Sequence, residues 1–436
     1  MSTPGFEIVP PTTSISQLPK VLSNPIPVIE ENLKKYGDPY GVRMGDGKIS
    51  IVSTNPSIVQ HVLQKKHRNY SKSDIQTEKI ATFIGKGLLT LDGQEWLRQR
   101  KLIQPGFHKK KIDSIKEKME HAIVVFYENL LKDTSEHAPI DIHEKMMQLA
   151  FKIVSYSLFG DSVTPEQMQR LRHAIEVAQV VVTKLIRLPF LSWWYEWSGI
   201  KSRALKLVNE SCKDLLSIIH QRRKEGEKGD LLDMLLEARY EDTGTCMSDQ
   251  QLIFELMILF VAGHETTANS LSWTFYSLAR HPDVLKKLRN EVSSGNTAYT
   301  RQVINESMRL FPPAWFTDRL ALVSDEIEGI HIPKNSLMIN YIYGLHRNQS
   351  IWERADDFDP DRFEEGKHII PYSFLPFGGG PRSCIGMQFA MMEMELAVHQ
   401  FVNKFQFELV NQNEVSLKPL VTLRPKGPIN MKVAPL

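Results

Sequence analysis

Apolar residues recur at helical spacing through the middle of the chain. Five stretches have this pattern and predict amphipathic helices: residues 112–131, 140–158, 165–185, 200–222 and 231–238. A longer helix is predicted over residues 248–279, with Ser248 as its N-cap, acidic Asp249 in its first turn and Pro282 just after its end. A last helix is predicted over residues 387–401, which are rich in Ala, Met, Glu and Leu.

Strand-like sequence is found near the two ends of the chain. It covers residues 41–44 and 49–52 in the first quarter, and residues 404–410 and 430–433 near the C-terminus. Helices between two strand-rich ends favour a mainly α fold with small β-sheets. No repeat, linker or shift in composition marks a boundary, so we expect a single domain over residues 1–436.

Composition and charge exclude several classes of protein. The 436 residues include 53 Lys+Arg and 51 Asp+Glu, and a net charge of +2 gives no reason to expect nucleic acid as a partner. Three widely spaced cysteines do not form a disulfide framework, which favours a reducing compartment. Residues 1–13 do not resemble a signal peptide, and the most apolar window, residues 252–263, is too short to span a membrane and contains Glu255. We therefore expect a soluble cytoplasmic protein without a membrane anchor.

The most informative segment is Phe-Gly-Gly-Gly-Pro-Arg-Ser-Cys-Ile-Gly at residues 377–386. Its glycines and proline disfavour regular structure before Cys384, and a predicted helix follows Gly386. The positive end of that helix and the nearby Arg382 both stabilise a thiolate, which is a good soft ligand for iron. The alternative is that Cys384 is a small buried apolar residue, the common fate of a free cysteine. A phosphate-binding loop is not supported, because no Gly-Lys-Ser/Thr follows the glycines.

The same segment resembles the haem-binding signature of the cytochrome P450 family, the haem-thiolate monooxygenases. All five fixed positions match: Phe377, Gly380, Arg382, Cys384 and Gly386. The resemblance implies the P450 fold, with haem b held between the long distal helix and the helix after the cysteine loop. It also implies that Cys384 is the axial iron ligand and that the other four residues lie at the cofactor.

A second motif lies on the long predicted helix. Ala262, Gly263, Glu265 and Thr266 belong to a stretch that resembles the oxygen-activation motif of the family. The first two have little side-chain bulk and leave room for a small ligand, while Glu265 and Thr266 supply an acid and an alcohol for proton delivery. We expect these last two to be catalytic. The alternative is an ordinary helix in which the threonine hydroxyl bonds back to the preceding turn.

Further family motifs follow in the expected order. Glu306 and Arg309 are three residues apart, so they share one helix face. The resemblance implies that they form a structural triad with Arg362 on the proximal side of the haem.

Four residues match family ligands of the haem propionates. They are Trp96, Arg100, Arg319 and Arg382. Arginine suits this task because its planar guanidinium pairs with a carboxylate through two hydrogen bonds. Each arginine, Arg319 above all, could instead lie at the surface. The forms of the motifs at Trp96 and Glu265 are similar to the eukaryotic-like branch of the family and its soluble bacterial members.

The resemblance places substrate contacts in segments with many apolar side chains, which favours a lipophilic small molecule. These side chains are Phe83, Ile84, Phe260, Val261, Trp315 and Phe316. An aromatic cluster at residues 189–197 would lie near a mobile lid of the site. It could gate entry, touch a membrane surface or pack between helices.

Electrons are expected from a separate protein, because the chain has no cysteine set for an iron–sulfur module. Lys101 and the lysines at 109–111 could dock an acidic ferredoxin or flavodoxin that works with an NAD(P)H reductase, or they could be solvated surface. We expect a monomer. A haem-thiolate peroxygenase, isomerase or dehydratase, or a non-catalytic haem sensor, remains possible. The pair Glu265 and Thr266 argues against the three enzymes, and a sensor usually lacks a full oxygen-activation helix.

Overall fold

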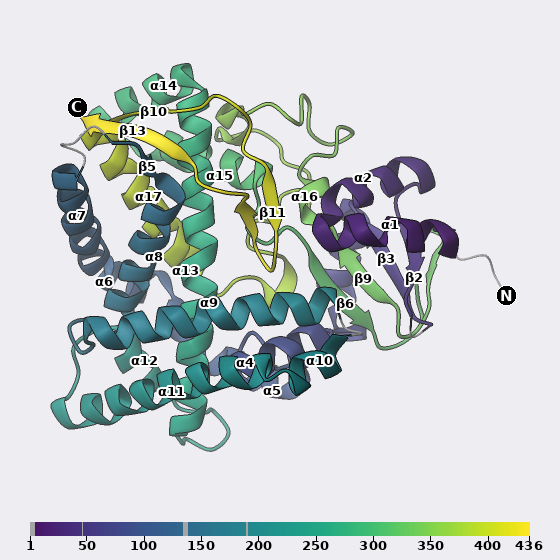
Figure 1. Ribbon diagram of the computed structural model, residues 1–436, viewed down its shortest axis with the longest axis horizontal. Coiled ribbons are helices and arrows are strands. Elements are labelled where there is room, and N and C mark those ends of the chain that lie inside the picture. The colour runs from purple at the N-terminus through teal and green to yellow at the C-terminus, as the bar shows by residue number, and fades with distance from the viewer. Residues whose placement is uncertain (1–4, 46, 134–137, 189–190) are drawn as a thin grey trace. The chain divides into compact units, whose positions relative to one another are not determined.

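The computed structural model describes residues 5–45, 47–133, 138–188 and 191–436 (Figure 1). The chain forms two compact units, each built from three separate segments. Unit 1 comprises Met1–Ser73, Trp273–Cys384 and Asn413–Gly427, and unit 2 comprises Asp74–Ser272, Ile385–Gln412 and Pro428–Leu436. The single domain expected from the sequence stays a prediction.

Unit 1 contains a six-stranded mixed sheet in the order β1-β2-β3-β9-β6-β4. The strands are β1 (Glu7–Ile8), β2 (Tyr40–Arg43), β3 (Ile49–Ser53), β4 (Tyr70–Ser71), β6 (Thr317–Ala321) and β9 (Leu337–Asn340). The predicted strands near residues 41 and 49 are confirmed as β2 and β3, whereas β6 and β9 were not predicted. Unit 1 also has two hairpins, β7 (Asp325–Ile327) with β8 (Ile330–Ile332) and β11 (Leu417–Pro419) with β12 (Leu423–Pro425).

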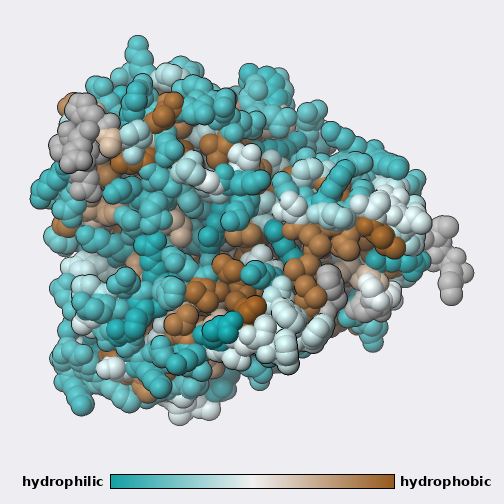
Figure 2. All heavy atoms as spheres, in the orientation of Figure 1, coloured by the Kyte–Doolittle hydropathy of each residue, from teal (hydrophilic) through white to brown (hydrophobic). Residues whose placement is uncertain are grey.

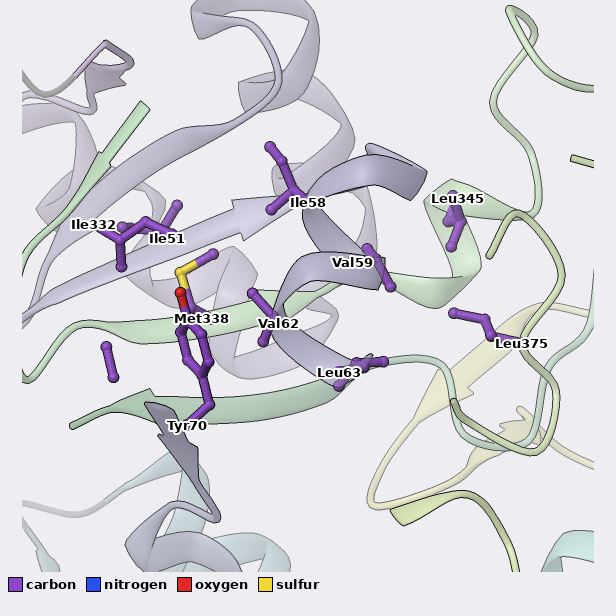
Figure 3. Packing of buried hydrophobic residues seen from close by; sticks show 11 residues of the cluster. Ile51, Ile58, Val59, Val62, Leu63, Tyr70, Ile332, Met338, Leu345 and Leu375 are labelled. Atoms are coloured by element: carbon purple, nitrogen blue, oxygen red, sulfur yellow. The ribbon is translucent and has the colours of Figure 1, made fainter. Parts of the chain in front are cut away.

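The helices of unit 1 begin repeatedly at proline. Four of its α-helices have proline as their first residue, where the missing N–H is not needed: α1 (Pro11–Ser23), α2 (Pro25–Tyr36), α3 (Pro56–Gln60) and α14 (Pro282–Ser293). The others are α15 (Ala298–Leu310), α16 (Ile342–Leu345) and the short helical turns η1 (His61–Lys65), η2 (His67–Asn69), η7 (Pro360–Phe363) and η8 (Gly380–Arg382). Figure 3 shows apolar side chains of α3 and η1, among them Ile58 and Val62, packing against the sheet residues Ile51 and Met338.

The predicted triad on α15 is confirmed inside unit 1. Arg309 and Glu306 are fully buried, and two hydrogen bonds of 2.7 Å join the guanidinium to the carboxylate. Arg362 on η7 donates to Glu306 Oε1 at 3.3 Å. Arg309 also donates to three backbone carbonyls, those of His346, Ala355 and Asp357. The pair therefore joins α15 to the irregular segment after α16.

Unit 2 is mainly helical, and the predicted helices are confirmed with small shifts of their ends. Its helices are α4 (Ala81–Ile84), α5 (Gly93–Ile103), α6 (Lys109–Ser114), α7 (Lys116–Asp133), α8 (Ile142–Phe159), α9 (Pro165–Arg187), α10 (Ser192–Trp197), α11 (Ile200–Glu225), α12 (Leu231–Glu237), α17 (Met387–Lys404), the turns η3 (Ile75–Ile80) and η4 (Gln104–Phe107), and α13 (Asp249–Arg280) as far as residue 272. Ser248 Oγ accepts from Gln251 N at 3.2 Å, which confirms the predicted N-cap of α13. A three-stranded sheet joins β10 (Phe405–Leu409), β13 (Asn430–Pro435) and β5 (Ile140–Asp141).

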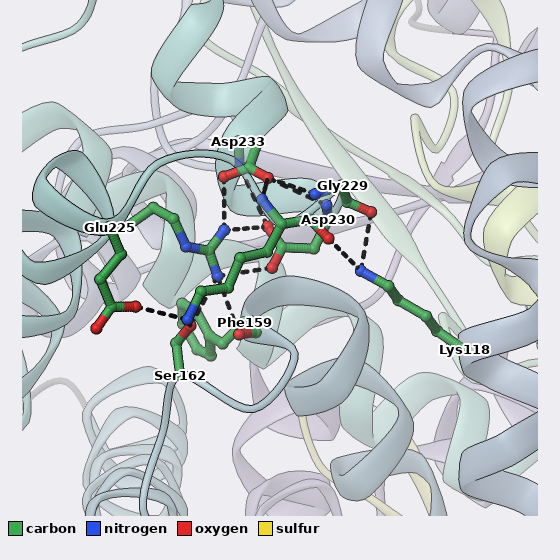
Figure 4. Close-up of polar contacts among 9 residues, drawn as sticks. Lys118, Phe159, Ser162, Glu225, Gly229, Asp230 and Asp233 are labelled. Atoms are coloured by element: carbon green, nitrogen blue, oxygen red, sulfur yellow. Dashed lines mark hydrogen bonds and ion pairs between the residues drawn. The ribbon is translucent and has the colours of Figure 1, made fainter.

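A buried ion cluster lies inside unit 2 (Figure 4). The guanidinium of Arg222 on α11 bonds to both carboxylate oxygens of Asp230 at 2.7 Å and to Asp233 at 2.6 Å. It also donates to the carbonyl of Phe159 and the hydroxyl of Ser162. Asp230 caps α12, with a capping box to Asp233. One arginine thus joins the ends of α8, α11 and α12.

None of the helices in the described ranges combines the length and the apolar character needed to cross a membrane.

Candidate functional site

The glycines of the segment that carries Cys384 determine its backbone conformation. Gly378 and Gly380 have φ angles of 69° and 68°, in the left-handed region where a side chain is disfavoured. A Cβ atom on Gly380 would lie 1.9 Å from the carbonyl oxygen of Leu63, so only glycine fits against η1. Cys384 N donates to Phe377 O at 2.9 Å and closes the turn. The Cys384 thiol is exposed, which contradicts the alternative of a buried apolar cysteine.

Two predicted propionate ligands reach one edge of the unit 1 sheet. Arg319 lies on β6 and donates to Asp318 O at 2.6 Å and Thr317 Oγ1 at 3.2 Å. Arg382 Nη1 donates to the carbonyl of Tyr70 at 3.2 Å, and Tyr70 pairs with Ala321 at the end of β6. Both guanidiniums therefore belong to the β4–β6 edge, and unit 1 brings Phe377, Arg382 and Cys384 together in one turn.

A polar cluster beneath this edge was not predicted from the sequence. Asp325 Oδ2 accepts from the Tyr70 hydroxyl at 3.0 Å and lies 2.9 Å from Nε2 of His61. Burial alone would raise the pKa of Asp325, but hydrogen bonds from His61, from the backbone N–H of Glu326 and from Tyr70 outweigh it and lower that pKa. The cluster ties η1 to β4, the two elements that contact Gly380 and Arg382.

The candidate oxygen-activation residues lie on α13 in unit 2. Ala262 is exposed, and Thr266 Oγ1 donates to its carbonyl at 2.6 Å, as the alternative of an ordinary helix expects. The hydroxyl oxygen can still accept a hydrogen bond from a ligand or water. A Cβ atom on Gly263 would lie 3.2 Å from Val154, so this glycine also permits the close approach of α8.

Glu265 is buried, in contrast to Ala262. Its carboxylate is buried, and Oε2 accepts from Gln179 Nε2 of α9 at 2.5 Å. The neighbouring His264 is buried as well, and its Nε2 lies 3.0 Å from Met147 O. Gln179 was not singled out in the sequence, since a lone glutamine on a helix carries no spacing signal.

Trp96 and Arg100 lie one turn apart on the same face of α5. Trp96 is buried, and Arg100 Nε donates to Gln104 Oε1 at 3.0 Å. Gly386 is the N-cap residue of α17.

The segment before α5 is fixed by Glu255, another residue that sequence reasoning missed. Both carboxylate oxygens of Glu255 lie 3.1 Å from Leu88 N, and a Cβ atom on Gly87 would lie 2.6 Å from this carboxylate. Glu255 is buried. It therefore joins the chain before α5 to α13.

Three tryptophans of the expected aromatic cluster at residues 189–197 are exposed on α10. Trp193, Trp194 and Trp197 expose 64%, 42% and 77% of their surface, which contradicts the interpretation of these three residues as helix packing. Pro189 and Phe190 of the same cluster lie outside the described residues. Figure 2 shows apolar side chains gathering on one face of the molecule among polar ones.

Two residues that were expected to contact the substrate, Phe260 and Trp315, are part of the core. Phe260 is fully buried and packs against Phe159 and Phe151 of α8, with ring centroids 5.5 and 5.7 Å away. Trp315 is buried beside Phe316 and donates to Leu420 O at 3.0 Å.

The chemistry of these side chains fits a haem. Unit 1 offers one exposed thiol, a soft donor for iron, and two guanidiniums suited to two propionates. Unit 2 offers the exposed Ala262 and the hydroxyl of Thr266 on one helix. The thiol and the two guanidiniums belong to unit 1, and Ala262 and Thr266 belong to unit 2.

Comparison with known proteins gives a consistent result. The family model described as Cytochrome P450 matches residues 4–433. The chain is 30% identical over 424 residues to cyclooctatin synthase from Streptomyces melanosporofaciens, covering 92% of this chain and 89% of that protein. It is 29% identical to cytochrome P450 3A12 from Canis lupus familiaris, covering 92% of this chain and 85% of that one. Its fold resembles that of the retinoic acid bound cyanobacterial CYP120A1, with a TM-score of 0.81, 23% identity and coverage of 93% and 94%.

Proposed function

The chain belongs to the cytochrome P450 family of haem monooxygenases, and from this premise we propose that it inserts one oxygen atom of O₂ into a lipophilic small molecule. The reaction balances as substrate R–H plus O₂, two electrons and two protons giving R–OH and water. A separate ferredoxin or flavodoxin with an NAD(P)H reductase supplies the two electrons. The observation that carries the proposal is the Cys384 turn, whose exposed thiol lies two residues from a sheet-anchored arginine.

The cofactor of the family is haem b, which when bound activates O₂ at its iron for transfer to a substrate. In this chain Cys384 is the proposed iron ligand. Arg319, Arg382, Arg100 and Trp96 are the proposed partners of the propionates. Gly380 keeps the cysteine turn close to η1, since any larger residue would clash with Leu63. Arg382, two residues before Cys384, adds positive charge to the same turn.

The substrate class is proposed to be lipophilic. The family relatives include one whose name states hydroxylation of lithocholate, lithocholate 6-beta-hydroxylase from Mesocricetus auratus, at 28% identity. We would screen a library of fatty acids, terpenoids, steroids and polyketides by the spin-state shift of the haem absorption band. Saturable shifts with apolar compounds and none with sugars or amino acids would support the proposal. The opposite preference would contradict it.

Thr266→Ala is expected to uncouple electron use from product formation. Thr266 Oγ1 is the hydroxyl that α13 presents beside the exposed Ala262, and it can hold a water and pass a proton. Without it, reducing equivalents should go to hydrogen peroxide, so product formed per NAD(P)H should fall about tenfold or more. Product and peroxide yields are measured together with any accepted substrate.

Ser270→Ala is the matched control, because it removes a hydroxyl that donates to a helix carbonyl, that of Thr266, at 3.0 Å on the same helix. The Ser270→Ala variant should form as much product per NAD(P)H consumed as the unaltered chain. Glu265→Gln should slow turnover with a changed solvent isotope effect, as its carboxylate is proposed to supply protons and the hydrogen bond from Gln179 positions it. A fully coupled Thr266→Ala variant would favour the peroxygenase or isomerase alternatives.

The lysines at 109–111 are proposed to dock the electron donor. They form the first turn of α6, where positive charge opposes the helix dipole, so they do not stabilise this helix. All three are exposed, while Lys101 is bridged to Glu241 at 3.2 Å.

Reversing Lys109, Lys110 and Lys111 to glutamate should slow association with an acidic donor at low salt, by about tenfold or more, and flatten its salt dependence. Stopped-flow reduction at several ionic strengths measures this. The control reverses three exposed lysines of α1 and α2, Lys20, Lys34 and Lys35, with the same change of net charge. Equal slowing in both variants would show a nonspecific effect of net charge and contradict the docking role.

A further inference from the structure

One carboxylate in unit 1 joins η1 to β4. Asp325, the first residue of β7, accepts a hydrogen bond from the Tyr70 hydroxyl at 3.0 Å, and the same oxygen lies 2.9 Å from Nε2 of His61. Its other oxygen accepts from the backbone N–H of Glu326 at 2.9 Å. The side chains of Asp325 and His61 are each only 11% exposed, and Tyr70 is buried. Both carboxylate oxygens are therefore fixed, and they hold η1 and β4 at a set separation.

The cysteine turn contacts the backbone of these same two elements. Gly380 lies so close to the carbonyl of Leu63 in η1 that no Cβ atom fits between them. Arg382 donates to the carbonyl of Tyr70 in β4 at 3.2 Å. Leu63 and Tyr70 also belong to one buried apolar cluster (Figure 3). Because Leu63 and Tyr70 make these contacts with their backbone, a shift of η1 or β4 is transmitted to the turn, four and two residues before Cys384.

The first of these elements, η1, is a π-helical turn. Its characteristic hydrogen bond runs from Lys66 N to His61 O at 2.8 Å, over five residues. Such turns are rare, and many of them lie at functional sites. His61 begins this turn and Leu63 lies in its middle. The contact between His61 and Asp325 therefore helps to fix the Leu63 carbonyl against which the cysteine turn packs.

We propose that Asp325 is a positioning residue for Cys384. Through His61 and Tyr70 it keeps η1 and β4 in place, and these two elements keep the cysteine turn in the conformation in which its thiolate binds iron. Removal of a partner that orients a metal ligand commonly weakens the metal site by ~10–100-fold. The proposal rests on the proposed function, since it takes Cys384 as the iron ligand. It gives a role to an acidic side chain that belongs to none of the sequence motifs.

The test compares Asp325→Leu with the unaltered chain after both are loaded with haem and reduced under carbon monoxide. Leucine has a similar branched shape but accepts no hydrogen bond, so the Tyr70 hydroxyl and the His61 ring lose their partner. The red-shifted Soret band should decay about tenfold faster or more. In the same loaded chain, residues 377–386, where Cys384 N donates to Phe377 O at 2.9 Å, should take up deuterium about tenfold faster or more.

Milder variants carry the test if Asp325→Leu does not fold. Asp325→Asn keeps an oxygen that can accept from Tyr70, and it should retain most of the red-shifted band. Tyr70→Phe removes only the hydroxyl and should speed the decay of the band. It should add little to Asp325→Leu, because the two changes break the same contact. His61→Gln keeps a side-chain N–H and should retain more of the band than His61→Leu.

Glu291→Leu is the matched control in unit 1. The Glu291 carboxylate accepts from Tyr299 N at 2.6 Å and joins α14 to α15, so its loss should lower stability and leave both measurements unchanged. Equally fast decay of the band in this control, or an unaltered decay in both Asp325→Leu and Tyr70→Phe, would overturn the proposal. A red-shifted band that is missing already in the unaltered chain would contradict the proposed function itself, and this proposal with it.

Discussion

Cys384→Ser is expected to eliminate the thiolate signature of the reduced carbonyl complex, its red-shifted Soret band. Cys384 is the exposed thiol in a turn that Gly378 and Gly380 hold in the left-handed region, two residues from Arg382. A serine hydroxyl fits the same space but does not supply a thiolate at neutral pH. The measurement is the carbon monoxide difference spectrum of the reconstituted protein, and the expected loss is complete.

The other two cysteines provide matched controls. Burial raises the pKa of the Cys212 thiol, which keeps it protonated and a poor ligand near neutral pH. Cys246 is exposed and pairs with Arg239 in an isolated β-bridge before α13. Cys212→Ser and Cys246→Ser should therefore keep the spectrum unchanged. A red-shifted band that survives in Cys384→Ser would show that another residue binds the iron.

Arg222→Met is expected to destabilise unit 2 strongly, by about 3–5 kcal/mol in the free energy of unfolding. The variant leaves two buried carboxylates, Asp230 and Asp233, without their cation. Arg170→Met is the control from the same unit, since Arg170 forms a two-bond pair with Asp214 at an exposed position. Its loss should destabilise the protein far less, because exposed ion pairs contribute little to stability. Urea denaturation at pH 7, followed by circular dichroism, measures both, and equal effects would contradict the argument from burial.

The loss of stability caused by Arg222→Met should also depend on pH. Burial alone would raise the pKa of Asp233, but hydrogen bonds from Arg222 and from the N–H groups of Lys228 and Gly229 outweigh burial, so its pKa in the folded chain is lowered. The stability it contributes is complete above the pKa of the unfolded chain, about 3.9, and is lost as pH falls through the folded value. In Arg222→Met the carboxylate of Asp233 loses this hydrogen bond while it stays buried, which raises its pKa. The stability difference between the two proteins should therefore narrow below about pH 5.

The sequence predicted the helices well because each buries one face, and apolar residues at helical spacing mark that face. It did not predict β6, because Asp318 and Arg319 interrupt a five-residue strand that pairs on both sides. β9 was missed because Leu337, Met338 and Ile339 form a continuous apolar run, which periodicity does not distinguish from a buried helix segment. β6 lies next to β4 at the edge that Arg319 and Arg382 share.

The motif residues were found by resemblance, and their supporting partners were not. Gln179, Glu255 and Asp325 each contact a residue of a motif or the segment beside it, and each lies far from it in the sequence. A single buried polar side chain has no periodicity, so only the folded chain identifies its partner. Arg222 was missed for the same reason, as it lies within an ordinary basic stretch at the end of α11.

The division of each unit into three segments has a consequence for synthesis on the ribosome. Unit 1 needs residues up to Gly427 and unit 2 needs residues up to Leu436, so neither can close until the last of its three segments has been translated. Until then α7 lacks its partner α17, and the ring of Tyr127 lacks Phe401 and Phe405. Nascent chains of this kind hold apolar helix faces open to solvent for the time of translation. Production of the protein should therefore benefit from added chaperones, which cover these apolar faces until the last segments have been translated.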